Sequence, residues 1–328
     1  MGKPSLLACA LLCLAATGAG NGQGTPNRFV VPAWAYPGSS AAIANPPPLD
    51  AVRPLSVPNS RAHFTEAQVN DMFAPPDWHP DAHPPMPEVV AHGRRPSLYA
   101  CGYCHLPTGA GRPENATLAG LPADYIVRQV KDFRSGARRS AWHEDYYPVV
   151  LMRQVAANAT DAEIAAAADY FSGLHLETRV KVVESARVPK TRQVGWLYAR
   201  IKGGGSEPLG HRIIEVPLDQ ERHELRDSAA GFIAYVPPGS IERGRTLVTT
   251  DGNGLTQACV SCHGADLRGI DPIPPLAGRS PTYVVRQLLA FRTGARSAAT
   301  AAPMRAVAEK LEVDDMIAIA AYVAAQRP

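Results

Sequence analysis

Two segments far apart in the chain share the same amphipathic helical pattern. In residues 125–138 and 283–296, tyrosine, glutamine and phenylalanine recur every four positions with apolar residues beside them, and a glycine follows the phenylalanine. This spacing gathers apolar side chains on one face of a helix, and a glycine commonly ends a helix. The alanine-rich stretches 161–172 and 314–326 predict two further helices. The pattern therefore predicts a mainly α-helical protein.

The two helical segments are copies of one another. Tyr125 and Tyr283 are 158 residues apart (283 minus 125), and the Leu-Ala-Gly of residues 118–120 recurs at the same spacing in residues 276–278. Self-similarity of this kind indicates a duplicated domain. We expect two domains, 61–174 and 238–328.

The segment between the copies, residues 175–237, has a different pattern. Short runs of β-branched and aromatic residues are separated by glycine and proline, which predicts strands. The runs are 179–183, 197–201, 212–216 and 232–236, and three consecutive glycines at 203–205 predict a turn. We expect a small β-containing insertion, which is either a docking or shielding subdomain or a linker packed on both copies.

The first 60 residues predict export followed by an extended arm. Residues 1–19 combine a basic head at Lys3, a short apolar stretch and small residues, which is the pattern of a cleaved signal peptide. The apolar stretch is shorter than the roughly 20 residues that cross a bilayer, so we expect no transmembrane segment in the mature chain. Residues 20–60 are rich in proline, which predicts an extended arm. We therefore expect a periplasmic protein.

A belt of histidine and proline precedes the first copy. Residues 77–86 contain two histidines, two aspartates and three prolines. The histidines and aspartates could bind a metal, but the prolines would hold them in an extended line. Packing along the first domain is therefore the favoured interpretation.

The four cysteines beyond residue 19 fall into two identical motifs, CxxCH. The motif residues are Cys101, Cys104 and His105 in the first copy and Cys259, Cys262 and His263 in the second. CxxCH is the attachment motif of c-type haem. Two thiols reach the two vinyl groups of one porphyrin, and the adjacent histidine becomes the proximal ligand of the iron. The sequence therefore predicts two covalently attached haem c groups. Zinc would leave the two histidines unexplained, and redox-active cysteine pairs would lack a thioredoxin-like setting.

A methionine in each copy is the candidate sixth ligand of the iron. Thioether sulfur suits haem iron, and His/Met ligation raises the redox potential. Met304 follows Pro303 in an expected loop before the last helix, and Met152 is its counterpart 152 residues earlier. His143 lies near Met152 and stays an alternative ligand in the first copy. The remaining methionines are expected to be structural, namely Met72, Met86 and Met316.

Charge and composition narrow the function further. A formal net charge of +3 gives neither an acidic tail nor a basic surface for nucleic acid. The sequence offers no convincing pair of nucleophile and base and no phosphate-binding glycine motif. Electron transfer needs neither, because the haem supplies the redox chemistry. Arg138 and Arg296 could pair with haem propionates, but solvated helix ends are the simpler interpretation.

Together these motifs resemble the class I cytochromes c, in particular the dihaem cytochrome c4 type. The resemblance rests on CxxCH, Leu-Ala-Gly, the Tyr-x-x-x-Gln-x-x-x-Phe helix, Gly-x-Arg and the methionine, and it covers residues 88–174 and 238–328. It implies two helical haem domains and electron carriage between a donor and an acceptor protein. It also implies His/Met ligation in both, by His105 with Met152 and by His263 with Met304.

Two features depart from that family. The second copy has Pro274 and Pro275 before its Leu-Ala-Gly, where the family offers a proline carbonyl to the proximal histidine. The first copy has Ala116 and Thr117 instead, so the partner of His105 is open. The insertion is also longer than the short linker of the family.

The leading hypothesis is a periplasmic dihaem cytochrome, not itself an enzyme. It would pass single electrons between an exported dehydrogenase or respiratory donor and a terminal acceptor. Its partners would be redox proteins and not nucleic acid, and peripheral contact with a membrane complex stays open. A dihaem peroxidase-like enzyme with one open haem is the main alternative, and a sensor whose ligand displaces an axial methionine is a third.

Overall fold

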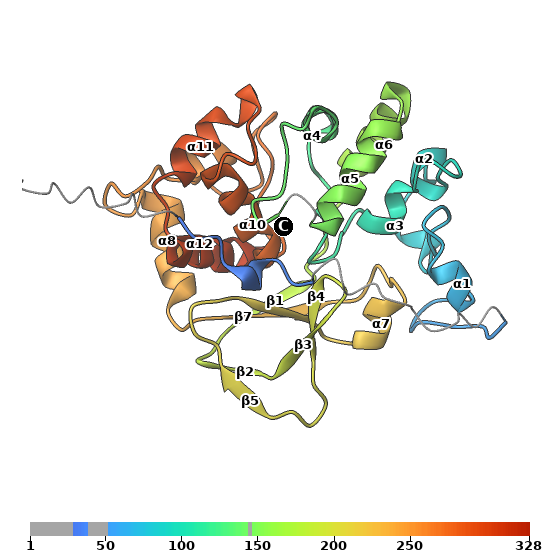
Figure 1. The fold of residues 1–328 in the computed structure, drawn as a ribbon, viewed down its shortest axis with the longest axis horizontal. Coiled ribbons are helices and arrows are strands. Elements are labelled where there is room, and N and C mark those ends of the chain that lie inside the picture. Colours follow the sequence, from blue (N-terminus) through green and yellow to red (C-terminus); the bar gives the residue numbers. More distant parts are fainter. Residues whose placement is uncertain (1–28, 39–51, 144–145) are drawn as a thin grey trace, which may run out of the picture. The chain divides into compact units, whose positions relative to one another are not determined.

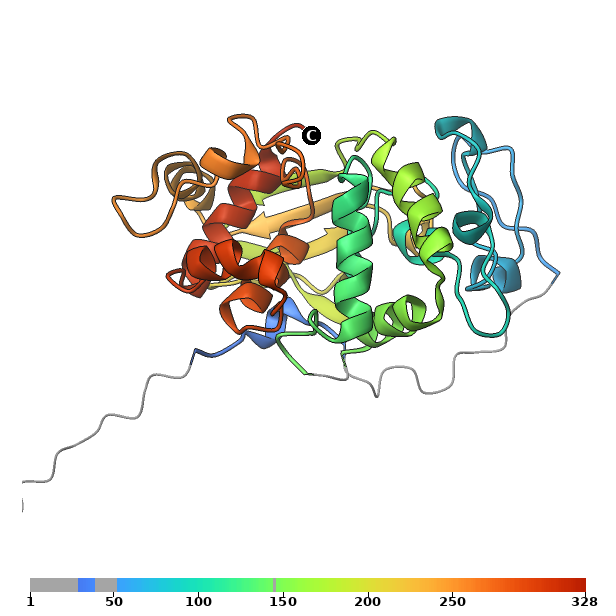
Figure 2. The same ribbon diagram turned by 90° about the horizontal axis from the view of Figure 1, so that it is seen from above.

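The structure is a computed structural model that describes residues 29–38, 52–143 and 146–328. Two groups of helices, one from each predicted copy, lie side by side, and strands of the insertion lie against them (Figures 1 and 2). This mainly α arrangement with a small strand-containing region confirms the predicted fold class. Among the described helices, none is long and apolar enough to cross a membrane. The predicted signal peptide, 1–19, lies outside the described residues.

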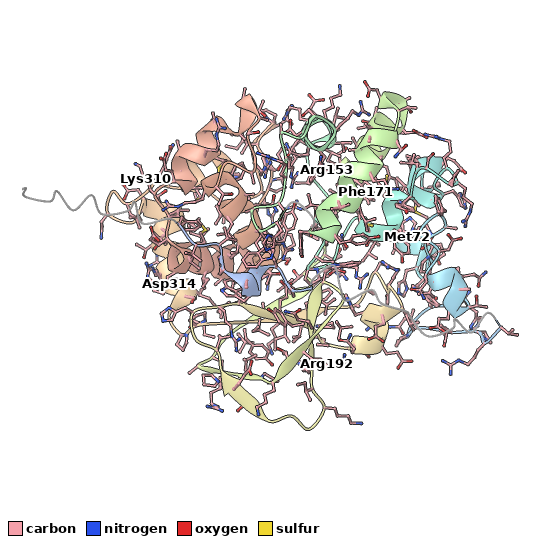
Figure 3. The ribbon with its side chains drawn as sticks, viewed as in Figure 1. Met72, Arg153, Phe171, Arg192, Lys310 and Asp314 are labelled. Atoms are coloured by element: carbon pink, nitrogen blue, oxygen red, sulfur yellow. The ribbon has the colours of Figure 1, made fainter. Side chains whose placement is uncertain are left out.

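The first copy is built from five helices. They are α2 (Glu88–Ala91), α3 (Cys101–His105), α4 (Ala123–Ser135), α5 (Tyr147–Asn158) and α6 (Asp161–Ser172). α4 packs against both α5 and α6, and Phe171 on α6, labelled in Figure 3, is fully buried in their common core. As predicted, α4 ends at Gly136 in the left-handed conformation, and Thr160 and Glu163 form a capping box that starts α6.

The second copy repeats this order, with a 3-10 turn before its fourth helix. Its elements are α8 (Ser240–Thr250), α9 (Val260–His263), α10 (Pro281–Arg292), the 3-10 turn η4 (Ala299–Ala301), α11 (Ala302–Ala308) and α12 (Val313–Ala325). α12 packs against α8 and α10. A Cβ atom at Gly244 on α8 would lie 2.0 Å from the carbonyl oxygen of Ala318, so this close contact requires glycine.

Both candidate methionines lie in helices, where the sequence predicted loops. Met152 is within α5 and Met304 is within α11. Pro148 and Pro303 occupy the first turns of these helices, where a proline is tolerated because the first N–H groups have no partner within the helix. The expected methionine loops are therefore corrected to short helical segments.

The insertion forms a three-stranded sheet and two small strand pairs. Its elements are β1 (Val180–Glu184), β2 (Arg187–Pro189), β3 (Thr191–Val194), β4 (Leu197–Arg200), β5 (Ser206–Pro208), β6 (Ile214–Pro217), the short helix α7 (Gln220–Glu224) and β7 (Phe232–Val236). The sheet has the order β1-β7-β6, with β1 parallel and β6 antiparallel to β7, and β2-β5 and β3-β4 are antiparallel pairs. All four predicted strands are confirmed. β2, β3 and β5 were missed because they are short and largely polar.

The two copies meet through reciprocal contacts. Arg138 donates hydrogen bonds to Gln129 of its own copy and to Gln287 of the other. Arg296, at the equivalent position, donates to Gln287 of its own copy and to Gln129 of the other. Each arginine also donates to a tyrosine hydroxyl across the interface, Tyr283 and Tyr125 respectively. This reciprocity is the kind that relates two-fold symmetric subunits. Both arginines are buried, so their interpretation as solvated helix ends is wrong.

The described part of the predicted arm is packed. Residues Ala33–Ala35 form the 3-10 turn η1, and the buried Tyr36 stacks on Trp142 and meets Tyr146 edge-on. The extended arm is therefore corrected for this part, because its aromatic residues bury enough apolar surface to fix it. Residues 39–51 lie outside the described part.

The belt before the first copy is also packed. It contains α1 (Glu66–Val69) and the 3-10 turn η3 (Pro80–Ala82). Trp78 is buried, and its indole N–H donates to the carbonyl of Leu225 over 2.6 Å. His79 contacts Asp227 of the insertion over 2.8 Å. Since no three His, Cys, Asp or Glu side chains are grouped to hold a metal ion anywhere in the described residues, the packing interpretation is favoured.

Candidate functional site

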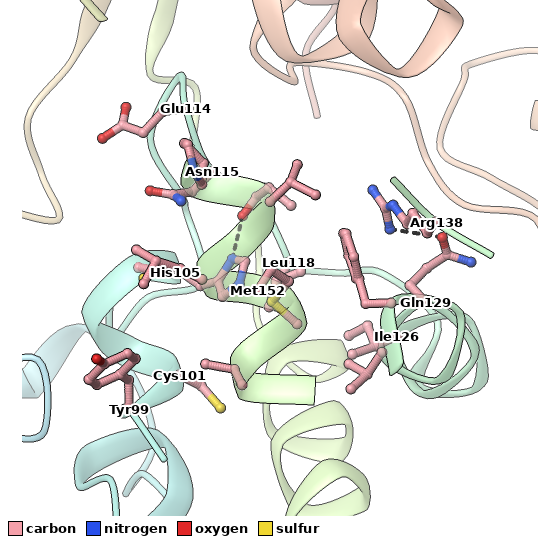
Figure 4. Close-up of a pocket in the computed structure, with 18 of the residues that line it drawn as sticks. Tyr99, Cys101, His105, Glu114, Asn115, Leu118, Ile126, Gln129, Arg138 and Met152 are labelled. Carbon is pink, nitrogen blue, oxygen red and sulfur yellow. Dashed lines mark hydrogen bonds between the residues drawn. The ribbon is translucent and has the colours of Figure 1, made fainter. Parts of the chain in front are cut away.

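A cavity of ≈ 360 Å³ lies in the first copy, between α3, α4, α5 and α6 (Figure 4). All four residues predicted for the first haem line it, namely Cys101, Cys104, His105 and Met152. Apolar side chains such as Leu118 and Ile126 form much of the remaining wall. A mostly apolar cavity with a few convergent polar groups is typical of a cofactor site.

His105 is held in the tautomer that a metal ligand requires. Its Nδ1 lies 2.8 Å from the carbonyl oxygen of Ala116, the contact drawn as a dashed line in Figure 4. Because a carbonyl only accepts, the ring proton is on Nδ1 and the lone pair of Nε2 is free. Burial lowers the pKa of His105, which keeps the ring neutral. The partner left open by the sequence is therefore the Ala116 carbonyl.

The two cysteines of the first CxxCH, Cys101 and Cys104, are free thiols at the cavity wall. Burial raises the pKa of Cys101 to about 12, and burial also raises the pKa of Cys104. A neutral buried thiol is a poor nucleophile and a poor disulfide exchanger. The environment thus argues against a redox-active cysteine pair and is compatible with thioether attachment.

The position of Met152 distinguishes it from His143. Met152 reaches the cavity from α5, and His105 reaches it from α3 (Figure 4). His143 is exposed, does not line this cavity, and packs its ring against Trp142 with centroids 4.7 Å apart. The geometry therefore favours Met152 as the sixth ligand of the first site.

Segments outside the first copy complete the cavity wall. Trp196 and Arg226 come from the insertion, Tyr36 from the arm and Arg286 from α10 of the second copy. The Arg226 guanidinium lies over the ring of Tyr103, 3.5 Å from its centroid, and donates to the Tyr103 carbonyl over 3.0 Å. The sequence analysis missed these residues because nothing in the insertion pattern ties it to a CxxCH motif.

A buried charged cluster borders the same cavity. Arg112 pairs with Glu114 over 3.1 Å and donates to Nε2 of His223 on α7. Burial, followed by the positive charge of Arg112, lowers the pKa of His223 well below its usual value, so the ring stays neutral and accepts this hydrogen bond. A second, polar cavity of ≈ 470 Å³ shares Arg112, Glu114 and Arg226 with the first.

The second CxxCH repeats the histidine geometry. Nδ1 of His263 lies 2.8 Å from the carbonyl of Pro274, and burial lowers the pKa of His263. Burial raises the pKa of Cys259 to about 11, whereas Cys262 is exposed. Met304 packs against an apolar cluster of Phe291, Ala301 and Ala308. Neither cavity described above is lined by His263 or Met304, so the structure does not join them as it joins His105 and Met152.

Known proteins identify the family of the chain. Residues 241–326 match the family model described as cytochrome c. Cytochrome c-554(548) of Halomonas halodenitrificans is 44% identical over 76 residues, which are 23% of this chain and 92% of that protein. The chain belongs to the cytochrome c family. Covalently bound haem c is accordingly its cofactor.

Longer matches refine this assignment of the cytochrome. A thiosulfate dehydrogenase electron acceptor of Stutzerimonas stutzeri is 27% identical over 235 residues, or 71% of this chain and 81% of that protein. Cytochrome c4 of Azotobacter vinelandii is 26% identical over 230 residues, or 68% of this chain and 82% of that protein. These matches confirm the predicted dihaem class I cytochrome c of the c4 type, a class of electron-transfer cytochromes.

The residues of the first cavity fit haem c. They offer two free thiols three positions apart and a neutral imidazole whose free nitrogen is Nε2. They also offer a thioether sulfur and a mainly apolar wall. These are the kinds of group that c-type haem sites use to attach the cofactor and ligate its iron.

Proposed function

We propose that this cytochrome binds two haem c groups and passes single electrons in the periplasm. The donor is an exported dehydrogenase or a respiratory protein, and the acceptor is a terminal redox protein. When bound, the haem iron supplies the one-electron chemistry. The chain supplies axial ligands, burial and the surface on which partners dock.

Each predicted domain provides one binding site. In domain 61–174, Cys101 and Cys104 attach the haem, and His105 and Met152 ligate its iron. In domain 238–328, the corresponding residues are Cys259, Cys262, His263 and Met304. Segment 175–237 is a cover for the first site, in line with the contribution of Trp196 and Arg226 to its wall.

One observation carries the proposal. A single cavity is lined by both thiols of the first CxxCH, by a histidine whose Nδ1 is tied to a carbonyl, and by Met152. The backbone orients His105, so the ring does not have to reorganise when the iron changes its charge. The same Nδ1 contact at His263 supports an equivalent site in the second copy.

The names of relatives support the class of partner. Two relatives, from Stutzerimonas stutzeri and Thiomonas intermedia, are named as electron acceptors of thiosulfate dehydrogenase. A relative from Chlorobaculum tepidum is named as the cytochrome subunit of sulfide dehydrogenase. These names favour an exported dehydrogenase that oxidises an inorganic sulfur compound as the donor. Peripheral binding to a membrane complex is compatible with this role.

Spectroscopy with haem quantification tests the proposal. We expect two haems per chain, both low-spin, with the weak sulfur-to-iron absorption band at the red edge of the oxidised spectrum and no binding of carbon monoxide. One high-spin haem that binds carbon monoxide or peroxide would support the alternative, a peroxidase-like enzyme. The position of Met152 at the cavity argues against that alternative.

A further inference from the structure

A single buried arginine connects the loops that hold the two proximal histidines. Nη1 of Arg279 donates to the carbonyl of Thr117 over 2.8 Å, and Nη2 donates to Ala119 over 3.1 Å. On its other side, Nε donates to the carbonyl of Pro275 over 2.7 Å. The first two carbonyls belong to the first copy and the third to the second copy. One planar group therefore spans both loops.

In each loop, the residue before the one bound by Arg279 offers its carbonyl to a proximal histidine. Ala116, the neighbour of Thr117, accepts from His105, and Pro274, the neighbour of Pro275, accepts from His263, both over 2.8 Å. The peptide planes of successive carbonyls meet at one Cα atom, so only the φ and ψ angles of that residue separate their directions. In the second loop the ring of Pro275 also fixes φ, so holding one carbonyl limits how far the next can turn.

The burial of Arg279 argues that its contacts matter. Arg279 is 6% exposed, and its three hydrogen-bond partners among the described residues are all backbone carbonyls. Burial lowers its pKa to about 10, so it still carries a positive charge at neutral pH. A buried cation without a carboxylate is costly unless its donors are satisfied, and here carbonyl oxygens satisfy them.

The repeat shows that this arginine is not part of the copied pattern. Arg138 and Arg296 recur at a spacing of 158 residues, but the position equivalent to Arg279 in the first copy is Leu121. Leu121 is buried and apolar, so it cannot make the reciprocal contact. One guanidinium therefore serves both copies.

We propose that Arg279 is a positioning residue for both proximal histidines and couples the two redox sites. It holds the two histidine loops in a fixed position relative to each other. A change in the orientation of one histidine ring is therefore transmitted to the loop that holds the other histidine. It touches neither histidine and acts through the carbonyls of Thr117 and Pro275. This inference rests on the proposed binding of two haems.

The test compares Arg279→Met and Arg279→Lys with the wild type as intact holoproteins. Haem content is measured first, and both midpoint potentials and the electron paramagnetic resonance g-values of both haems are then recorded. We expect Arg279→Met to shift both potentials and both sets of g-values. We expect Arg279→Lys to change the g-values as well, because an ammonium keeps the charge but lacks the fork that spans both loops.

Arg134→Met is the matched control. Arg134 also joins backbone carbonyls, of Ala156 and Ala159, but it contacts neither histidine loop. It should lower the melting temperature without moving either potential. Unchanged potentials and g-values in Arg279→Met, a change at one site only, or wild-type behaviour of Arg279→Lys would each overturn the inference. Fewer than two haems in the wild type would instead overturn the proposed function.

Discussion

The two CxxCH motifs have the same chemistry and different surroundings. At the first, Tyr103 lies between the cysteines and is covered by Arg226 of the insertion. At the second, Ser261 occupies the equivalent position, and it is exposed together with Cys262. Two large apolar side chains near the second motif are also exposed, Leu255 and Ile270.

The difference shows what duplication copied and what was added. The copied features are the predicted ligands, the carbonyl contacts of the histidines and the reciprocal arginines at the interface. The covers of the first site come from the arm and the insertion, which have no second copy. At the position of Ile270 the first copy has Arg112, which is tied to His223 and Glu114. Segments outside the first copy thus cover the first CxxCH, whereas Ser261 and Cys262 of the second are exposed.

The largest expected effect comes from removing one sixth ligand at a time. Met152→Ala should abolish half of the sulfur-to-iron band, open the first haem to carbon monoxide and lower its midpoint potential. Axial ligands set haem potentials over about 0.8 V, so a fall on the order of 0.2 V is expected. Met304→Ala is the matched variant and should do the same to the second haem. If His143 were the ligand, Met152→Ala would leave the band and the potentials intact.

Replacing either reciprocal arginine, Arg138 or Arg296, should lower the free energy of unfolding by a similar amount. The segments that cover the first site, in contrast, act on one copy only. Each glutamine accepts from both arginines, so Arg138→Met and Arg296→Met each remove one of two arginine donors from each glutamine and the arginine donor of one tyrosine hydroxyl. Each variant should therefore destabilise the fold by about 1 to 3 kcal/mol. Chemical denaturation of the holoprotein measures this loss. The two losses should agree within about 1 kcal/mol. A large loss in only one variant would show that the contacts are not energetically symmetric.

Replacing Arg226 should change the midpoint potential of the first haem and leave that of the second unchanged. Its positive charge lines the first cavity and favours the reduced, less positive iron, so Arg226→Gln should lower the first midpoint potential by on the order of 50 mV. Arg226→Lys keeps the charge and should shift it less. Arg268→Gln, next to the open second site, is the exposed control, and solvent should screen its effect. Equal shifts of both potentials in Arg226→Gln would contradict the role of the insertion as a one-sided cover.

Sequence reasoning found the features that depend on local pattern. The helix that ends at Gly136, the capping box at Thr160 and the strand that became β7 (Phe232–Val236) each follow from short-range spacing. CxxCH is a local motif, whereas Met152 was predicted from its match with Met304 in the second copy. The structure places all four predicted residues of the first site at one cavity.

The missed features depend on contacts between distant segments. Arg226 and Trp196 meet the first cavity only because the insertion folds back on the first copy. The burial of Arg138 depends on the docking of the two copies, and no periodicity in one helix reveals this. The Ala116 carbonyl could replace that of a proline because the backbone, and not the side chain, makes the contact with His105.

The smallest expected effect concerns the belt, which precedes the first copy and has no counterpart before the second. A hydrogen bond from His83 to Asp77 raises the pKa of His83 above its usual value of 6.5. Because the folded-state pKa is the higher one, this contribution is complete below about pH 6.5 and is lost as the pH rises through the folded-state pKa. His83→Gln should therefore lower the free energy of unfolding by about 0.5 kcal/mol more at pH 6 than at pH 8.5, after allowance for solvent screening. Thermal unfolding at the two pH values measures this difference. His92→Gln, which replaces an exposed histidine of the same region, is the control variant. A His83→Gln loss that is equal at both pH values would mean that this belt contact is not charge-assisted.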